Sequence, residues 1–272
     1  MTIKHPLAFP IAFPITPTIF LLEQHSRLGQ YLLQSSDQLL APEQQQKLQR
    51  LASKPAQEFK ISRLLIQLLF DHWFDAWQLA ITDNGKPYLK QQLKQPSCGF
   101  NLSHSQQLIG LLVNPNGDCG LDIEWCNNKL DPFEIASTVF TGKETQQLEQ
   151  SSDPLQLFFD LWVAKEARLK LIGKGFSQDP KSLEFNLDQP NFPDSQSTNS
   201  HFSDGHFSDN QNSNSDPLWL FQQHTTAKGQ FHVAASGHTF KQAPNIYLLD
   251  LSSELQLQST AVDLAARSIK KR

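Results

Sequence analysis

Hydrophobic residues recur at helical spacing in two regions of the chain. The first region covers residues 41–74, where a polar amphipathic segment begins near Pro42 and a more apolar segment follows. Proline is favoured in the first turn of a helix, so Pro42 indicates a helix start. The apolar residues of the second segment lie three and four positions apart: Ile61, Leu64, Leu65, Leu68 and Leu69. We therefore predict two helices in this region.

The second helical region runs from Asp131 to the glycine-rich GKG at residues 173–175. Glycines after the last periodic position are typical of a helix end. Between the two regions the pattern changes. FNLSHS at 100–105 alternates apolar and polar residues, LIGLLV at 108–113 is apolar throughout, and a turn then leads into the strand-like CGLDIEW. These features predict a β-hairpin in the middle of the chain.

Two further segments carry turn and strand signals. NGKPYL at 84–89 predicts a reversal followed by a short extended piece, because Asn-Gly favours tight turns. Residues 219–237 predict a second hairpin near the C-terminus. Residues 188–216 differ in composition from these two segments. They consist almost only of Asn, Ser, Asp, Gln, Pro and His with isolated Phe. Such a segment buries too little apolar area to offset its ordering entropy, so we predict a mobile loop without an assigned function.

Composition narrows the classes of protein. The 272 residues suffice for one large domain or two small ones, and the net charge of −4 argues against a nucleic-acid binder, although local basic patches are compatible with it. The three cysteines form no metal-binding pattern and are typical of reduced thiols in a cytoplasmic protein. The apolar N-terminus contains four prolines in its first 17 residues, which a targeting or membrane helix tolerates poorly. We expect a soluble protein with no membrane partner.

The strand GLDIEW places two carboxylates one residue apart. In an extended strand Asp122 and Glu124 leave the same face, and Ile123 points to the other side. Two carboxylates that reach one point either repel or share a cation, and oxygen ligands suit a hard ion such as magnesium. The alternative is a solvent-facing edge strand with alternating polar residues.

The segment WVAKEARLK offers a third carboxylate. On a helix, Trp162, Glu166 and Lys170 follow one another at i, i+4 steps and form one stripe. Glu166 is thus available to join the two carboxylates of the strand. The alternative is an ordinary surface salt bridge between Glu166 and Lys170, which contributes little to stability.

Six short motifs, read in order, resemble the phosphopantetheinyl transferase superfamily, in particular its longer, broad-specificity, single-chain type. The motifs are APEQQQKLQR, GKPYL, FNLSHS, GLDIEW, FTGKE and WVAKEARLKLIGKG, and the resemblance spans roughly Leu40 to Phe185, with weaker agreement in the final hairpin. The most specific pieces are the G-[ILV]-D-[ILV]-E strand and the F-x-x-x-E and W-x-x-K-E-x-x-x-K helices. Both helical pieces are complete, as Phe140–Glu144 and Trp162–Lys170.

The resemblance implies a reaction and a set of residues for it. Family members transfer the phosphopantetheine arm of coenzyme A to a serine of an apo acyl or peptidyl carrier protein and release adenosine 3′,5′-bisphosphate. By motif position, Asp122, Glu124 and Glu166 would hold Mg²⁺, and Lys170 would contact the pyrophosphate and stabilise the leaving group. Glu166, or a water held by it, would take the serine proton, with Glu144 in a supporting role.

The resemblance also implies residues that bind coenzyme A. Lys86 and the pair Ser103 and His104 match positions that contact its phosphates, with His104 on the 3′-phosphate. Lys47 falls where the family often has a basic residue for the same phosphate. The alternatives are a lysine in a turn and a buried, hydrogen-bonded histidine.

This sequence departs from the family in its first helices. Gln44, Gln49 and Phe59 stand where basic residues are frequent, so the arginine-rich run of the family is thinned. Either coenzyme affinity is weaker than is usual, or Lys60 and Arg63 compensate.

The fold class that the resemblance implies is α+β. Two similar α/β halves, each a small antiparallel sheet with a long helix, would form an intramolecular pseudo-dimer with the active site in the cleft between them. We place the N-terminal, coenzyme-binding half at residues 1–116, the catalytic half at 117–255, with the insertion 188–216, and a tail at 256–272. The protein is expected to act as a monomer.

Two rival functions use the same residues. A metal-dependent pyrophosphatase or phosphodiesterase would place water where the serine attacks. A degenerate paralogue would only bind carrier proteins, although such a binder has no need of three carboxylates and a lysine. The sequence leaves open which carrier protein, and hence which pathway, is served.

Overall fold

The computed structural model describes residues 11–90, 98–173, 178–187, 217–226, 229–253, 256–262 and 266–269. The predicted mobile loop at 188–216, most of the proline-rich opening and the last residues of the tail lie outside the described residues. Among the helices that are described, none is long and apolar enough to cross a membrane.

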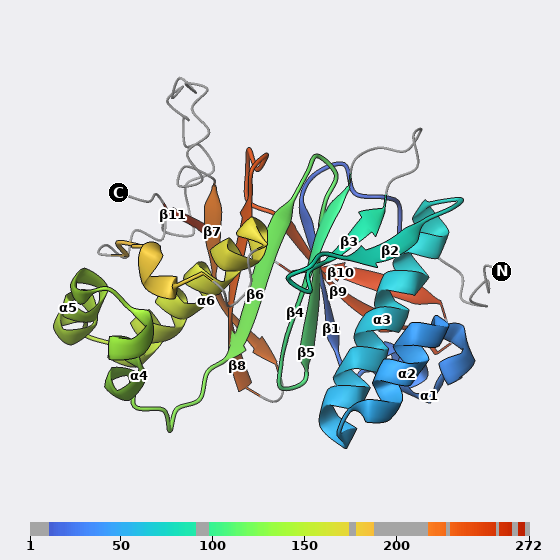
Figure 1. Ribbon diagram of the computed structural model, residues 1–272, viewed down its shortest axis with the longest axis horizontal. Helices are drawn as coiled ribbons and strands as arrows, with labels where there is room; N and C mark the ends of the chain where they lie inside the picture. The colour runs from blue at the N-terminus through green and yellow to red at the C-terminus, as the bar shows by residue number, and fades with distance from the viewer. Residues whose placement is uncertain are drawn as a thin grey trace.

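The helices and strands follow one another in groups along the chain (Figure 1). The first part comprises β1 (Thr18–Glu23), α1 (Arg27–Gln34), the 3₁₀ turn η1 (Asp37–Leu39), α2 (Pro42–Arg50), α3 (Ser53–Trp73), β2 (Gln78–Ile81), β3 (Pro87–Lys90), β4 (Gly99–Ser105) and β5 (Leu108–Asn114). The second part comprises β6 (Cys119–Trp125), α4 (Pro132–Val139), α5 (Gly142–Gln150), α6 (Pro154–Ile172), the 3₁₀ turn η3 (Pro180–Ser182), β7 (Leu218–Thr226), β8 (Gly229–Gly237), β9 (Asn245–Leu251), β10 (Leu257–Ala261) and β11 (Ala266–Ile269). The predicted helices and both predicted hairpins are confirmed.

The described strands form two larger sheets and a two-stranded ribbon. The five-stranded sheet has the order β10-β9-β1-β5-β4, the four-stranded sheet has the order β11-β7-β8-β6, and β2 pairs with β3. The mixed α+β class is confirmed, but the expectation of purely antiparallel sheets is wrong for one pair, because β1 and β9 are parallel. Parallel neighbours need a long connection, and here β6, β7 and β8 of the four-stranded sheet all lie between them in the chain. Thus β9 and β10, which the sequence analysis assigned to the second half and the tail, pair in the first sheet.

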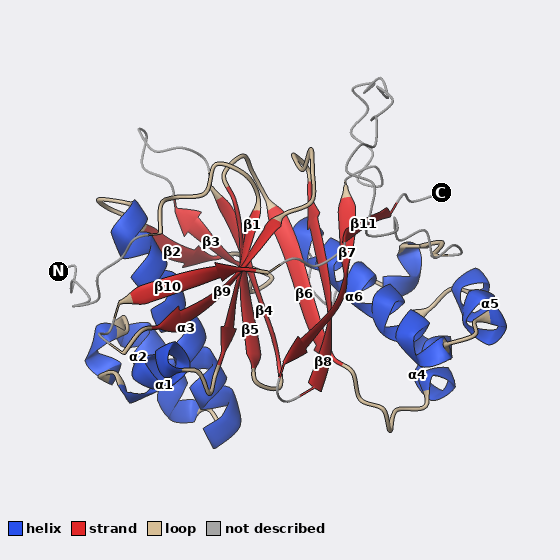
Figure 2. Cartoon of the chain, turned by 180° about the vertical axis from the view of Figure 1, so that it is seen from behind, coloured by secondary structure: helices blue, strands red, loops and turns tan. Residues whose placement is uncertain are grey.

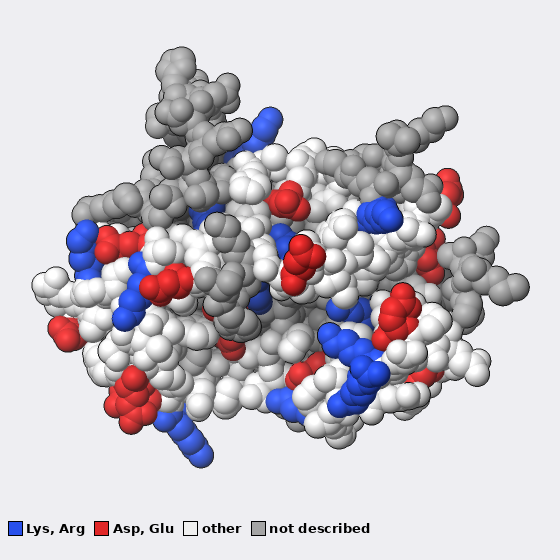
Figure 3. Space-filling view, viewed as in Figure 1, with Lys and Arg blue, Asp and Glu red and all other residues white. Residues whose placement is uncertain are grey.

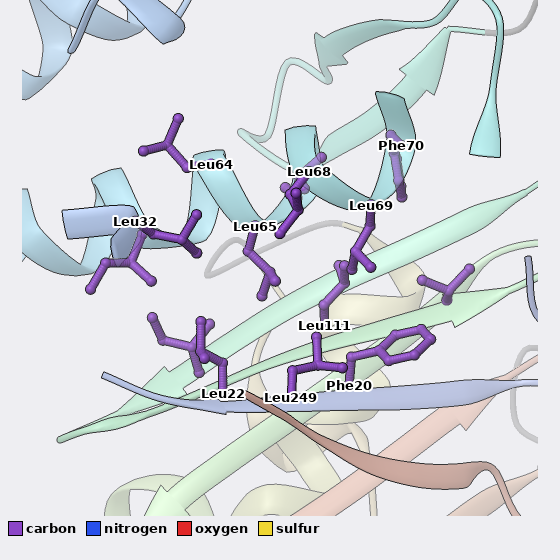
Figure 4. Close-up of a cluster of buried hydrophobic side chains, with 14 of the residues drawn as sticks. Phe20, Leu22, Leu32, Leu64, Leu65, Leu68, Leu69, Phe70, Leu111 and Leu249 are labelled. Atoms are coloured by element: carbon purple, nitrogen blue, oxygen red, sulfur yellow. The ribbon is translucent and has the colours of Figure 1, made fainter. Parts of the chain in front are cut away.

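Helices α1 and α3 cover one face of the five-stranded sheet, and α3 contributes more buried residues to this core than α1 (Figure 4). Leu65 and Leu69 of α3 lie opposite Phe20 of β1 and Leu111 of β5. The apolar positions that predicted this helix are all buried: Ile61, Leu64, Leu65, Leu68 and Leu69. Helical periodicity therefore placed the right face of α3 on the sheet.

Helix α6 packs on β6 and β8 of the four-stranded sheet, with α4 and α5 beside it (Figure 2). Asp153 caps its N-terminus, and Gly173 ends it in the left-handed conformation with φ 74°. Gly120 of β6 permits the close approach of the helix, because a Cβ there would stand 2.0 Å from the carbonyl oxygen of Ala167. The glycine of the GLDIE motif is therefore a packing requirement.

The two larger sheets also share an apolar interior. Ile19 and Leu21 of β1 point away from α3 and join a cluster with Leu121 and Ile123 of β6 and Val233 of β8. The outer strands β4 and β6 of the two sheets lie side by side, as both ribbon views show (Figures 1 and 2). The candidate site is built on this pair of edge strands.

Candidate active site

Three polar side chains of β4 reach across to β6. Asn101, Ser103 and Ser105 alternate with Leu102 and His104, so they leave one face of the strand. Their oxygens accept hydrogen bonds from alternate backbone N–H groups of β6: Asn101 from Leu121 at 2.9 Å, Ser103 from Ile123 at 3.2 Å and Ser105 from Trp125 at 2.9 Å. Side chains therefore satisfy the N–H groups along the outer edge of β6, with which none of the described strands pairs.

Asp122 is the most buried of the predicted metal ligands, with 3% of its surface exposed. Its Oδ1 accepts hydrogen bonds from the Ser103 hydroxyl at 3.0 Å and from the Lys170 ammonium at 2.6 Å. Its Oδ2 is buried and has no hydrogen-bond partner. Ile123 is fully buried in the core behind it, which confirms the predicted alternation of the strand. A buried carboxylate oxygen without a partner is costly unless a ligand completes it.

Glu124 lies on the same side of β6 and is held by two donors. The Ser105 hydroxyl donates to its Oε2 at 3.0 Å, and the indole of Trp162 donates to its Oε1 at 3.4 Å. Burial, and then the negative charge of Asp122, raises the pKa of Glu124 to about 7. Asp122 and Glu124 thus interact electrostatically, as their spacing predicted.

The predicted stripe on α6 faces these two carboxylates. Trp162 contacts Glu124 and Lys170 contacts Asp122, with Glu166 between them in the sequence. Burial raises the pKa of Glu166, the charge of Asp122 raises it further, and Lys170 opposes both. The surface-salt-bridge alternative therefore does not describe Lys170, whose partner is the buried Asp122.

The donor chemistry of this site fits a hard cation. The three carboxylates interact electrostatically, because the charge of Asp122 raises the pKa of both Glu124 and Glu166. One buried oxygen, Oδ2 of Asp122, has no hydrogen-bond partner. Oxygen ligands of this kind suit Mg²⁺. As the side chains stand, no three acidic, histidine or cysteine groups in the described part of the chain are close enough together to hold a metal ion.

His104 lies beside this site, on the opposite face of β4 from Ser103. Its Nδ1 is 3.7 Å from Oε2 of Glu58, and the Lys54 ammonium is 3.9 Å from the same glutamate. Burial lowers the pKa of His104, and Glu58 acts against that shift. Lys170 and Asp122 also act on His104 electrostatically, so this histidine belongs to the same neighbourhood.

Lys86 lies at the other end of the strand pair. Its ammonium donates to the carbonyl oxygens of Cys119 and Leu171, both at 3.2 Å. Asn84 from the same turn donates to the carbonyl of Gly173 at 3.1 Å. The turn before β3 is thereby fixed to the C-terminal end of α6, where a cation also meets the negative end of the helix dipole.

Lys47 lies apart from these residues, on α2. Its ammonium stands 5.1 Å from the ring centre of Phe59, and the guanidinium of Arg63 stands at the same distance from that ring. All three residues line a cavity of about 850 Å³, and Lys and Arg side chains gather on the surface over α2 (Figure 3). Lys60 instead forms an ion pair with Asp37 at 2.6 Å, so Arg63 is the residue that accompanies Lys47.

Glu144 is enclosed in the interior. It is 0% exposed, and its carboxylate accepts hydrogen bonds from the backbone N–H groups of Thr141 and Phe185, both at 2.8 Å, while Lys165 forms an ion pair with it at 2.8 Å. A carboxylate sealed in this way cannot reach a substrate. The expected supporting role in the chemistry is therefore replaced by a structural one.

Sequence reasoning missed four residues of this neighbourhood: Asn101, Ser105, Lys54 and Glu58. The first two carried a usable signal, because the alternation of FNLSHS puts them on the same face as Ser103. Lys54 and Glu58 carried no usable sequence signal, because a lysine and a glutamate at i, i+4 on a helix ordinarily form a surface ion pair.

Comparisons with known proteins bear on the same region. A family model described as the 4′-phosphopantetheinyl transferase superfamily matches residues 118–236. A putative 4′-phosphopantetheinyl transferase of Synechocystis sp. is 34% identical over 157 residues, which cover 55% of this chain and 61% of the relative. The 4′-phosphopantetheinyl transferase HetI of Nostoc sp. is 34% identical over 96 residues, 35% of this chain and 40% of the relative.

A more distant relative is the L-aminoadipate-semialdehyde dehydrogenase-phosphopantetheinyl transferase of Homo sapiens, 28% identical over 179 residues, which are 58% of each chain. The chain thus spans about three fifths or less of the length of these relatives. The region matched by the family model contains β6 and α6, and with them Asp122, Glu124, Glu166 and Lys170. The chain is thus similar to the 4′-phosphopantetheinyl transferase superfamily over the region that carries these residues.

Proposed function

We propose that this protein transfers the phosphopantetheine arm of coenzyme A to a serine of an apo acyl or peptidyl carrier protein and releases adenosine 3′,5′-bisphosphate. The observation that carries the proposal is the contact of Lys170 with Asp122, whose second oxygen is buried without a partner beside two further carboxylates. A site with one cation and three acids suits a reaction that must neutralise a pyrophosphate and accept a proton.

Asp122, Glu124 and Glu166 are the residues that would hold Mg²⁺. When bound, the ion would neutralise charge on the pyrophosphate. Two features support this assignment: the unpartnered Oδ2 of Asp122, and the pKa values of both glutamates, which burial and the charge of Asp122 raise. A cation among these groups would reverse the repulsion between them.

Lys170 and Glu166 would act on the reacting atoms. The Lys170 side chain is 30% exposed, so its ammonium can donate to an oxygen of the leaving phosphate while it stays near Asp122. The serine oxygen would form a bond to the phosphorus of the phosphopantetheine arm as the pyrophosphate P–O bond breaks. The serine proton would pass to the Glu166 carboxylate, directly or through water.

Coenzyme A would be held mainly by His104, Lys86 and the basic residues of the first helices. His104 lies within the electrostatic reach of Lys54, and Lys47 accompanies Arg63 at the cavity. We therefore propose the 3′-phosphate at His104, with Lys54 as an additional cation. Ser103, which the family pattern also assigns to the coenzyme, would have to exchange a bond that it makes within the protein.

We further propose that the chain is an intramolecular pseudo-dimer with halves based on residues 1–116 and 117–255, in which β9 and β10 complete the sheet of the first half, and that it acts as a cytoplasmic monomer. The support is that each larger sheet packs with one long helix, α3 or α6, and that the edges of the sheets meet at the site. The free cysteines Cys98, Cys119 and Cys126 suit a reducing compartment.

The test incubates the purified protein with coenzyme A, Mg²⁺ and a panel of apo carrier proteins, and weighs the carriers by mass spectrometry. We expect at least one carrier to gain the phosphopantetheine arm, and Glu166→Gln to lose this activity by several orders of magnitude while it stays folded. Release of free phosphopantetheine without any carrier would favour the hydrolase instead. Carriers that bind and never change mass would favour a binding protein.

A further inference from the structure

The two larger sheets are joined at β4 and β6 by side chains and not by a backbone ladder. Strands that meet at their edges normally pair N–H to C=O. Here the side-chain oxygens of β4 accept hydrogen bonds from backbone N–H groups of β6. The pairs are Asn101 with Leu121, Ser103 with Ile123 and Ser105 with Trp125. We call this set of three contacts the polar ladder. Its rungs lie on the same stretch of β6 as the candidate metal ligands.

Ser103 and Ser105 do more than accept hydrogen bonds from the backbone of β6. Each hydroxyl has one donor and two acceptor sites. Ser103 accepts from the Ile123 N–H and from Lys170 at 3.0 Å, and donates to Asp122, so all three sites are used. Ser105 accepts from the Trp125 N–H and donates to Glu124. Each hydroxyl therefore fixes a carboxylate relative to the backbone of the neighbouring strand.

Geometry explains why this arrangement repeats. Ser103 and Ser105 are two residues apart on β4, and Asp122 and Glu124 are two residues apart on β6, so the repeat distances of the two strands match. A serine hydroxyl is short enough to reach both the backbone N–H and the side chain of the facing strand. The LSHS motif of β4 and the LDIE motif of β6 therefore contact each other directly.

We propose that Ser105 is a positioning residue for Glu124, and that Ser103 has the same role for Asp122, so that the polar ladder both joins the sheets and orients the carboxylates for their cation. This inference rests on the proposed function, in which these carboxylates hold Mg²⁺. It assigns the LSHS motif a role in addition to coenzyme binding. Partners that orient metal ligands in this way typically change metal affinity or activity by about 10- to 100-fold when they are removed.

Ser105 offers the cleaner test, because Ser103 also contacts Lys170 and is almost fully buried. The variants are Ser105→Ala, which removes the hydroxyl, and Ser105→Thr, which keeps it on a side chain suited to strands. Ser236→Ala is the matched control. Ser236 is a buried strand serine of the second sheet whose hydroxyl donates to the carbonyl of Pro217 at 3.2 Å, away from the acidic site.

The readout is the affinity for Mn²⁺, a probe with the same preference for oxygen ligands, measured by electron paramagnetic resonance on the full chain. We expect Ser105→Ala to bind Mn²⁺ about 10- to 100-fold more weakly, Ser105→Thr to recover most of the affinity, and Ser236→Ala to stay within about twofold of the wild type. The transfer assay should show a lower kcat for Ser105→Ala at saturating coenzyme A, with little change in KM for the carrier.

Circular dichroism and thermal unfolding decide whether each variant is folded at the assay temperature. If Ser105→Ala fails to fold, Ser105→Thr and a Ser105→Cys variant replace it, since a thiol is a weak hydrogen-bond donor of similar size. A folded Ser105→Ala protein with wild-type Mn²⁺ affinity would overturn the inference while the proposed function stands. A wild type that binds no Mn²⁺ and modifies no carrier would instead contradict the proposed function itself.

Discussion

Helix α6 carries two lysine–carboxylate pairs that differ in how completely they are enclosed. Lys165 pairs with Glu144 at 2.8 Å, and the two side chains are 2% and 0% exposed. Lys170, five residues further on, pairs with Asp122 at 2.6 Å, and its side chain is 30% exposed while that of Asp122 is 4% exposed. A lysine and a carboxylate thus form one fully buried pair and one pair that is open to solvent on the lysine side.

The difference lies in how the remaining polar atoms are satisfied. Glu144 also accepts from the N–H groups of Thr141 and Phe185, and Lys165 also donates to the carbonyl oxygens of Pro180 and Leu183. The Asp122 pair leaves Oδ2 buried and unpartnered. A buried charge that finds all its partners within the chain serves the fold, whereas one with an unfilled oxygen and a reachable cation is prepared for a ligand.

The largest expected effect is on the sealed pair. Lys165→Met removes the cation and leaves Glu144 charged in the interior, so we expect a loss of about 3–5 kcal/mol in the free energy of unfolding. Burial lowers the pKa of Lys165 even in the native protein, and Glu144 acts against that shift. Urea unfolding followed by circular dichroism measures the loss.

The double variant Lys165→Met/Glu144→Gln is the control for this prediction. It removes both charges, and the Gln side chain still accepts from one backbone N–H, so we expect it to be more stable than Lys165→Met alone. If Lys165→Met unfolds at the wild-type urea concentration, the pair contributes no stability and the contrast between the two lysines is lost.

Lys170→Met should show the opposite pattern. Loss of a donor aimed at developing charge typically lowers kcat by about 10²- to 10³-fold. Its loss of stability should be smaller than that of Lys165→Met, because the lysine is partly solvated and Asp122 keeps the hydroxyl of Ser103. The measurements are the carrier transfer assay and the same urea unfolding. A variant with normal turnover and a large loss of stability would make Lys170 a structural lysine like Lys165.

Local patterns predicted the parts of this contrast that depend on single elements. The stripe of Trp162, Glu166 and Lys170 follows from helical spacing, and the shared face of Asp122 and Glu124 follows from strand geometry. Lys165 lies one position before Glu166 and therefore on another face of α6, but nothing in the spacing says that this face is buried against Glu144. The neighbouring elements, and not the helix itself, determine which polar face of a helix is buried.

Contacts between distant segments were harder to predict for the same reason. The apolar run of β5 and the alternation of β4 predicted their hairpin, but nothing in the sequence indicated that β6 pairs with β8. β9 was expected in the second half and instead lies parallel to β1. Hydrophobic alternation determines which face of a strand is buried, but it does not determine which other strand pairs with it. The polar ladder depends on such a neighbour choice, so the role of Ser105 was not foreseen.

A third acid, Glu58, is held more loosely than the acids of the two pairs and gives the smallest expected effect. Its side chain is 12% exposed, and its basic partners stand further away, with Nδ1 of His104 at 3.7 Å and the Lys54 ammonium at 3.9 Å. Such loosely held groups can turn to an incoming phosphate at little cost. In the proposed complex the 3′-phosphate of coenzyme A is remote from the breaking bond, so it should affect binding more than turnover.

We expect His104→Ala to raise KM for coenzyme A about 10- to 100-fold, with a smaller change in kcat, since it removes one charge-assisted hydrogen bond. Comparison with dephospho-coenzyme A, which lacks only the 3′-phosphate, isolates the contact. The wild type should prefer the full coenzyme, and His104→Ala and Lys54→Ala should narrow that preference. Lys47→Ala should narrow it less, because Lys47 stacks on Phe59 at the cavity and does not neighbour His104. If Lys47→Ala alone narrows the preference, the 3′-phosphate lies at the cavity, and His104 has only a structural role beside Glu58.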